Sequence, residues 1–282
     1  MYRPLALFLG LRYGRARRSN GFLSFISAAS ILGIALGVMA LILGLSAMNG
    51  FERELRERVL AVVPHGETER VHGEVDNWPV VMKQLAATPG VLAVAPLIRV
   101  NGLLESGNHL KAVQLRAVLP EQEQQISRAS HFMTGKGLLA LTPGSNGVIL
   151  GKSIADKLGV KVGDSLTLLL PEVGQSDMSA AMKAPLQRRF TLVGLMEIGG
   201  QLDSLLGFIH LQDAQQALGI GDKVQGFSFR VEDLMNAQTY VYQAANLMPY
   251  PMYVRSWRNS QGSLYQDIQL VRTVMYVVML MV

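Results

Sequence analysis

The tripeptide Gly151-Lys152-Ser153 resembles the end of a phosphate-binding loop, so it is the first candidate for chemistry in this sequence. A complete loop has the pattern GxxxxGK[ST], because its glycines let successive backbone amides surround the phosphates. The first glycine of that pattern would fall at position 146, which is Asn146. The match is incomplete, and we do not expect this segment to bind a nucleotide.

Metal ligands and nucleophiles are also poorly represented. The five histidines follow no HExxH, HxxEH or HxH pattern; they are His65, His72, His109, His131 and His210. The chain contains no cysteine and no GxSxG motif, which excludes a thiol nucleophile and a serine nucleophile elbow. The sequence therefore predicts a non-catalytic protein without a resident metal. We next consider the helices and strands that the rest of the sequence predicts.

An uncharged run dominates the N-terminal part of the chain, since no Asp, Glu, Lys, Arg or His occurs from Ser19 to Phe51. A bilayer core about 30 Å thick needs roughly 20 helical residues. The sequence therefore predicts a transmembrane helix over residues 19–51. A cleaved signal peptide is the main alternative, but its apolar core is usually only about 7 to 15 residues long.

The distribution of charge predicts the orientation of this helix. The chain has 26 basic and 21 acidic residues. Five arginines precede the uncharged run, and the other 21 basic residues balance the acidic ones; the five are Arg3, Arg12, Arg15, Arg17 and Arg18. Basic residues collect on the cytoplasmic side of membrane helices, so we expect the N-terminus inside and the rest outside. The same balance argues against nucleic-acid binding.

Residues 1–18 mix these arginines with leucines and two tyrosines. Such a composition is typical of a short helix lying in the inner headgroup layer, and we expect a cytoplasmic interfacial segment here. A disordered basic leader is the alternative.

Small residues in the membrane helix predict a packing face. Gly33 and Gly37 form a GxxxG pair, and Gly44 extends the same surface. Small residues let a second helix approach closely within lipid, although glycine is also common in membrane helices generally. An apolar stripe with i,i+4 charge pairs continues past Phe51, so we expect the helix to extend as a stalk to about residue 63, where Pro64 ends it.

Residues 64–263 alternate between strand-like and helix-like runs. Strands are expected at 91–105, 110–119, 147–150, 165–170, 188–196, 205–211, 224–231 and 252–257, and helices at 78–87, 152–158, 213–218 and 234–248. The first and last thirds share a strand, helix, strand pattern. We therefore predict an α+β domain with two subdomains, in which a β-rich part of about residues 120–220 is inserted into the other.

Two further segments stand out. Pro171 to Pro185 is a polar loop that contains Met178 and Met182, and loops of this length are usually functional or disordered. Residues 264–282 form a helix-like run that ends in apolar residues and is too short to span a membrane. We interpret the run as the start of a second transmembrane helix, so the chain holds one complete span and part of another.

The whole chain resembles the transmembrane subunits of the lipoprotein-releasing (Lol) ABC transporter. Three segments carry most of the resemblance: Met1 to Tyr13 (MYRPLALFLGLRY), Ser46 to Glu54 (SAMNGFERE) and Val62 to Gly66 (VVPHG). It continues through Val148 to Lys152, Ser204 to Gln216 and Arg255 to Trp257. Residues 200–203 and 265–269 are more similar to the LolE type than to the LolC type.

This resemblance implies a multi-pass permease of the bacterial inner membrane with a MacB-like periplasmic domain. The implied partners are a cytoplasmic ATPase dimer, a second permease subunit, triacylated lipoprotein cargo, membrane lipid and a periplasmic chaperone. The chain itself would hold no cofactor, because ATP and Mg belong to the ATPase. The alternatives are a MacB/FtsX-like mechanotransmitting permease for efflux or regulation, and a single-span anchored sensor or binding module.

The resemblance also implies site residues. In this family the outer ends of the first two spans line the lipoprotein cavity, which assigns Met48, Phe51 and Leu55 to the cargo site. Ile268, Val271 and Met275 are the candidates from the second span. A loop recruits the chaperone in LolC-type subunits, and the matching loop is Pro171 to Pro185, whose sequence departs from that pattern.

Overall fold

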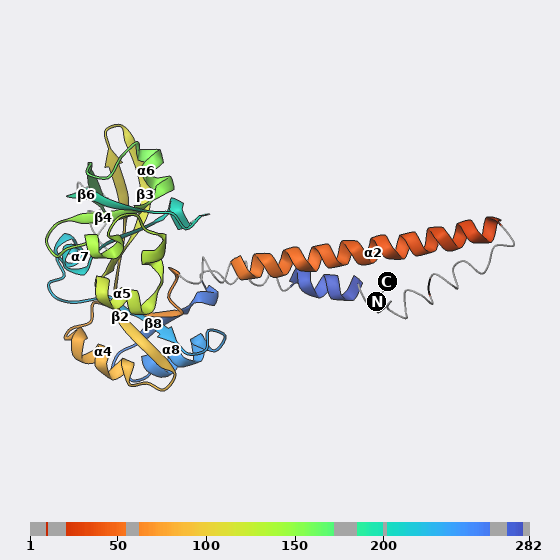
Figure 1. Ribbon diagram of the computed structural model, residues 1–282. Helices are drawn as coiled ribbons and strands as arrows, with labels where there is room; N and C mark the ends of the chain where they lie inside the picture. Colours follow the sequence, from red (N-terminus) through yellow and green to blue (C-terminus); the bar gives the residue numbers. More distant parts are fainter. Residues whose placement is uncertain are drawn as a thin grey trace, which may run out of the picture. The chain divides into compact units, whose positions relative to one another are not determined.

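The computed structural model describes residue 10 and residues 21–54, 62–171, 185–199, 202–259 and 270–278. The chain forms two compact units (Figure 1): one comprises Met1–Arg53 and Leu264–Val282, and the other comprises Glu54–Ser263. The interfacial segment predicted for residues 1–18 lies outside the described residues apart from Gly10. In the stalk predicted to extend to about residue 63, residues 55–61 also lie outside the described residues.

The first unit contains helix α2, Gly21–Glu54. Its stretch from Phe25 to Gly50 has a mean hydropathy of 2.5 and is long and apolar enough to cross a membrane. At a rise of 1.5 Å per residue these 26 residues extend about 39 Å, more than a bilayer core of about 30 Å. Only 6% of the span's most apolar window is buried, which distinguishes α2 from the core helix of a globular protein. A second helix of this unit covers residues 270–278.

The second unit begins with a four-stranded antiparallel sheet in the order β9-β1-β8-β2. Its strands are β1 (Gly66–Arg70), β8 (Gly226–Val231), β9 (Met252–Ser256) and the first part of β2 (Val91–Ser106). Helix α4 (Trp78–Ala86) connects β1 to β2, and α8 (Ala237–Ala245) connects β8 to β9. This arrangement is the split βαβ motif of ferredoxin-like folds.

The chain enters and leaves this sheet on adjacent strands. β1 pairs with β9 from Gly66 opposite Ser256 to Arg70 opposite Met252. Just outside the pair, the Trp257 amide donates to the His65 carbonyl at 3.1 Å. Trp257 is 1% exposed, and its indole N–H donates to the Leu234 carbonyl at 2.7 Å. A backbone hydrogen bond therefore joins the residue before the first strand of the sheet to the residue after its last strand.

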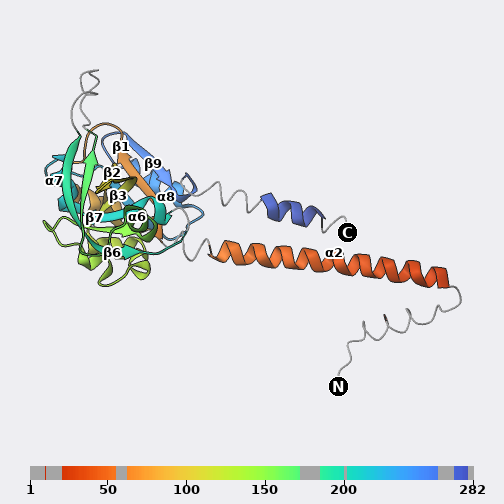
Figure 2. The same ribbon diagram turned by 90° about the horizontal axis from the view of Figure 1, so that it is seen from above.

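The middle of the chain forms a closed ring of six strands. Figure 2 labels four of them, β2, β3, β6 and β7, in a view from above. The strands pair in the order β2-β3-β7-β4-β6-β5 and back to β2, so the ring is a small barrel. The new members are β3 (His109–Val118), β4 (Gly147–Gly151), β5 (Ser165–Leu170), β6 (Leu186–Met196) and β7 (Leu206–His210). Ile149, Phe190 and Phe208 are at most 1% exposed and belong to its core.

Strand β2 joins the two sheets. Val91 to Leu97 pairs with β8 in the first sheet, whereas Ile98 to Ser106 pairs with β3 in the barrel. The remaining helices are α5 (Pro120–Ile126), α6 (Lys152–Leu158) and α7 (Leu211–Leu218), with short 3-10 turns at Ala129–Phe132, Gly137–Ala140 and Leu202–Ser204. The predicted mixed architecture of helices and strands is confirmed, while β1 and α5 were not predicted.

Candidate functional site

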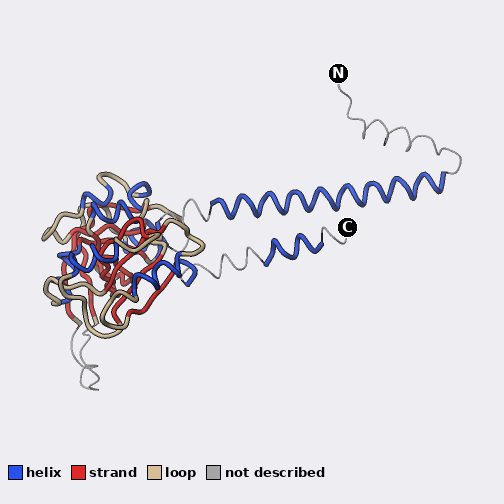
Figure 3. The backbone as a smooth tube through the Cα atoms, turned by 90° about the horizontal axis from the view of Figure 1, so that it is seen from below, coloured by secondary structure: helices blue, strands red, loops and turns tan. Residues whose placement is uncertain are grey.

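One face of α2 packs against the helix at 270–278, and Figure 3 shows the two helices running side by side. Most described side chains of α2 are exposed. The exceptions follow a helical spacing and form a single face: Gly37, Leu41, Gly44, Leu45 and Met48. On the facing helix, Arg272 and Met275 are the half-buried residues among exposed neighbours.

Two contacts define this interface. A Cβ atom added to Gly44 would collide with the terminal methyl group of Met275, so the glycine leaves the space that the methionine fills. Nearer the end of the candidate span, the Arg272 guanidinium donates to the Asn49 side-chain oxygen at 2.9 Å. Gly33, the first glycine of the GxxxG pair, has no such neighbour within 4 Å among the described residues.

The predicted cargo residues are placed only in part. Met48 lies one turn beyond Gly44 on the packed face, and Met275 meets that face from the other helix. Val271 is 45% exposed. Phe51 belongs to α2 by its backbone, but its side chain, Leu55 and Ile268 lie outside the described part of the chain. The packed face therefore brings two of the six candidates together.

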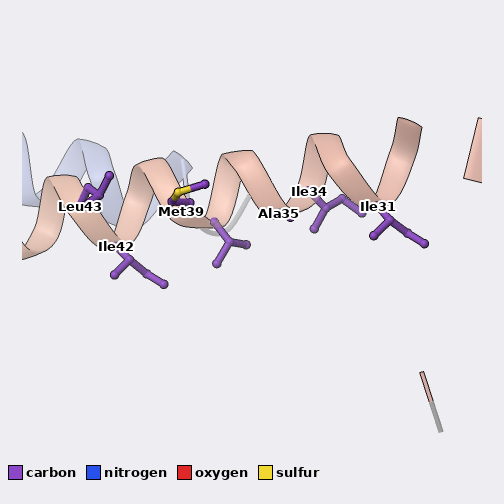
Figure 4. Close-up of a pocket in the computed structure, with 7 residues that line it drawn as sticks. Ile31, Ile34, Ala35, Met39, Ile42 and Leu43 are labelled. Carbon is purple, nitrogen blue, oxygen red and sulfur yellow. The ribbon is translucent and has the colours of Figure 1, made fainter. Parts of the chain in front are cut away.

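A second apolar surface occupies another face of α2 (Figure 4). It consists of Ile31, Ile34, Ala35, Val38, Met39, Ile42 and Leu43, which recur every three or four residues. All seven come from one helix, so this hollow has a single wall and is an open strip of side chains. Such a strip suits lipid tails or another membrane helix, and it offers no enclosed volume to a ligand.

The segment that resembles a phosphate-binding loop has a structural role. Gly151 ends β4 and caps α6, and a Cβ there would collide with the backbone of Asp203. The Lys152 ammonium pairs with Glu197 at 3.0 Å. The glycine is therefore required by a close backbone approach, and the lysine already has a partner.

A cluster of charged side chains links the sheet to the barrel, and the sequence analysis missed it. Arg99 and Arg116 face each other directly across the β2–β3 pair. Glu67 from β1 pairs with both: it contacts Arg99 and lies 3.7 Å from Arg116. Arg116 also pairs with Glu123 of α5 at 3.6 Å. The carboxylate of Glu67 thus offsets the repulsion that two opposed arginines would otherwise feel.

This cluster is enclosed by further hydrogen bonds. Arg116 donates to the Ser228 hydroxyl at 3.1 Å, and the Ser127 hydroxyl donates to Glu123 at 2.9 Å. Burial, together with repulsion from Arg255 and Arg116, lowers the pKa of Arg99 to about 10, so Arg99 stays charged at neutral pH. Each carboxylate is held by an arginine, which suits a rigid joint and leaves no free acid or base for catalysis.

Period-two alternation was the signal that could have revealed β1. In Gly66-Glu67-Thr68-Glu69, the glycine and the threonine are buried while the two glutamates are partly exposed on the other face. A strand whose outer face carries carboxylates has no continuous apolar run, and such runs are what predicted the other strands. Among the described residues there is also no group of three or more potential metal ligands.

The predicted chaperone loop is anchored between neighbouring strands. Pro171 follows β5 and Pro185 precedes β6, and these strands pair antiparallel up to Leu170 opposite Leu186. Met178 and Met182 lie outside the described residues.

Comparisons with known proteins agree with this architecture. Residues 27–247 match the family model of the MacB-like periplasmic core domain. The chain is 35% identical over 281 residues to the lipoprotein-releasing system transmembrane protein LolE of Haemophilus influenzae, covering 98% of this chain and 66% of that protein. It is 34% identical over 283 residues to the corresponding LolC of Neisseria meningitidis serogroup B, covering 99% and 67%.

The periplasmic region of MacB from Actinobacillus actinomycetemcomitans aligns with 76% of this chain and 96% of its own, at 11% identity and a TM-score of 0.42.

The chain spans about two thirds of the length of the curated LolE and LolC relatives, and the alignments with these two relatives extend over nearly all of its residues. The chain therefore belongs to the family with a MacB-like periplasmic core domain and, within it, to the transmembrane proteins of lipoprotein-releasing systems.

Proposed function

We propose that this chain is a permease subunit of an ABC transporter that extracts lipoproteins from the bacterial inner membrane and releases them toward a periplasmic chaperone. The observation that carries the proposal is the identity of 34–35% with Lol transmembrane proteins over 98–99% of the chain. That match includes α2 as well as the second unit, Glu54–Ser263, which we call the exterior domain. It therefore concerns the membrane function and not the core domain alone.

Work in this transporter is divided between subunits. The described residues hold no catalytic constellation, and we infer that ATP and Mg bind to a separate cytoplasmic ATPase dimer. A second permease subunit would complete the membrane part. The chain contributes a membrane helix, an exterior domain and the start of a further helix to this assembly.

The packed face of α2 is the proposed cargo site. Met48 and Met275 both lie on this face, and Gly44 leaves the space that Met275 fills. Methionine side chains are flexible and apolar, so they can adapt to acyl chains, which need contact area and no directional bonds. Phe51, Leu55 and Ile268 would enlarge the same surface.

The subunit type is a finer proposal. LolE and LolC relatives match this chain almost equally, at 35% and 34% identity. We infer the LolE type from residues 200–203 and 265–269. The loop between Pro171 and Pro185 is accordingly proposed as a periplasmic contact that differs from the chaperone-recruiting loop of LolC-type subunits.

Photocrosslinking tests the function. A crosslinker in a lipoprotein's acyl-bearing N-terminus should capture this chain in the assembled transporter, and the double variant Met48→Asp, Phe51→Asp should lose the adduct. Ala47→Asp is the matched control, because Ala47 lies at the same depth on an exposed face. Copurification of the ATPase shows that each variant assembles.

The outcomes separate the candidate functions. Loss of the adduct in the double variant alone supports lipoprotein extraction through this face. Undiminished crosslinking in an assembled double variant contradicts the assignment. A chain that copurifies with an ATPase but never crosslinks to lipoprotein would instead be a mechanotransmitting permease, and one without an ATPase would be an anchored sensor.

A further inference from the structure

The packed face of α2 is closed in this structure. A Cβ atom on Gly44 would collide with the terminal methyl group of Met275, so the methionine already fills the gap between the two helices. Carbon atoms in contact stay about 3.5–4.0 Å apart, so an acyl chain on this face needs a gap several ångströms wider. If the face receives cargo, as proposed above, the two helices must separate before an acyl chain can enter.

A polar contact lies next to the methionine. Arg272 is three residues before Met275 on the helix at 270–278, and its guanidinium donates to the Asn49 side-chain oxygen at 2.9 Å. Asn49 is the last residue but one of the candidate span, Phe25–Gly50. It follows Gly44 by five positions, which is about 7.5 Å along α2. The hydrogen bond and the contact of Gly44 with Met275 therefore join the same two helices at neighbouring levels.

This hydrogen bond cannot survive separation of the helices. A donor and an acceptor lose their interaction beyond about 3.5 Å, so an opening of a few ångströms breaks it. Measured hydrogen bonds between membrane helices correspond to roughly a 3- to 30-fold change in an association equilibrium. Asn49 is exposed near the end of the span, where arginine side chains reach interfacial water, so both groups can be solvated after opening.

We propose that the hydrogen bond between Asn49 and Arg272 is a latch that controls the entry of acyl chains to the packed face. The bond holds the two helices together when no cargo is bound, and it breaks when acyl chains separate them. Its strength then sets the fraction of transporters whose packed face is open. This inference rests on the proposed function, because it adds a control on access to the proposed cargo site.

Substitutions at Asn49 test the latch in opposite directions. Asn49→Leu removes the acceptor at similar volume, so it should raise the open fraction about three-fold or more. Asn49→Asp offers a carboxylate to Arg272, and an ionised acceptor makes the bond roughly twice as strong, so the open fraction should fall by a similar factor. The same two substitutions at Ala47 are the matched controls, because Ala47 is exposed and lies two positions away, on the opposite side of α2.

Electron paramagnetic resonance measures the open fraction in the full-length transporter in nanodiscs, with partner subunits free of cysteine. The distance is taken between spin labels at Leu43→Cys and Val274→Cys, whose native side chains are 64% and 52% exposed, so the labels stay off the packed face. Arg272→Leu provides a further check. In its presence Asn49→Asp should no longer reduce opening, since both residues act through one bond.

Photocrosslinking to the acyl-bearing end of a lipoprotein relates opening to cargo. Asn49→Leu should increase the initial rate of adduct formation, and Asn49→Asp should reduce it. The latch is overturned if both variants shift the helix distance in the same direction, or if the Ala47 variants match them. It is also overturned if opening changes while a transporter that captures lipoprotein does so at an unchanged rate. Opposite shifts in a transporter that never captures lipoprotein would support the latch and overturn the proposed function.

Discussion

Replacing Arg116 by methionine should destabilise the exterior domain more than any loss of a surface charge. The Arg116 side chain is 6% exposed, and its partner Glu123 is 1% exposed. Methionine retains most of the length and the apolar contacts of arginine. The variant therefore removes a charge and leaves Glu123 buried without an ion-pair partner among the described residues, although the Ser127 hydroxyl still donates to it.

The expected cost follows from that burial. Breaking a buried ion pair by removing one partner costs about 3–5 kcal/mol, because the remaining charge cannot regain its hydration. For a domain of this size each kcal/mol lowers Tm by roughly 2–4 °C, so Tm should fall by about 6–20 °C. Glu67 should contribute less to the loss, because Arg99 still pairs with it.

Thermal unfolding of the full-length chain in nanodiscs measures this effect, with fluorescence of the buried Trp257 as the signal. The double variant Arg116→Met, Glu123→Met should recover much of the loss, since a buried pair replaced by apolar residues is often neutral. Lys152→Met is the control, because the Lys152–Glu197 pair is exposed and worth about 0–1 kcal/mol. If Arg116→Met and Lys152→Met lower Tm equally, the burial argument is refuted.

Three further predictions follow from glycines and histidines. Gly44→Ile should push the two membrane helices apart, because the new side chain would occupy the space that Met275 fills. The variant should reduce crosslinking between cysteines engineered into the two helices of this cysteine-free chain, whereas Gly33→Ile should not. Equal effects of the two variants would contradict the assignment of the packed face to Gly44. Gly226→Ala should destabilise the domain by about 1–3 kcal/mol in thermal unfolding, since its Cβ would collide with the β1 backbone, and a neutral result would contradict that packing. Burial lowers the pKa of His65 and of His210, so the unfolded chain binds more protons. The unfolding free energy should therefore fall as pH drops below about 6.5, and the double variant His65→Gln, His210→Asn should flatten that dependence.

Much of the secondary structure could be predicted because the barrel strands are short apolar runs. β4 and β7 are buried at every position, and both were expected within one or two residues of their bounds. Strand β1 was missed because Glu67 and Glu69 occupy its outer face. The two carboxylates pair with Arg99 and Arg255, which come from other parts of the chain.

The pairing of distant strands and helices likewise could not be predicted from the pattern of apolar and polar residues. The strand-like run at 91–105 predicts one strand, but nothing in it indicates that β2 changes partners from β8 to β3 near Ile98. The same limit applies to the sites. Gly44 was expected to face a helix from its size alone, whereas the pairing of Asn49 with Arg272 required two helices to be set side by side.

The hydrogen bond from Trp257 to His65 has a consequence for how this protein can be rearranged. It brings the domain's two flanking segments onto neighbouring strands, which lie about 4.8 Å apart in a sheet. A domain with its ends this close can be moved between host chains, or circularly permuted, without stretching the segments on either side. The exterior domain can thus be transferred as a unit, because its two ends leave the sheet side by side at the hydrogen bond between Trp257 and His65.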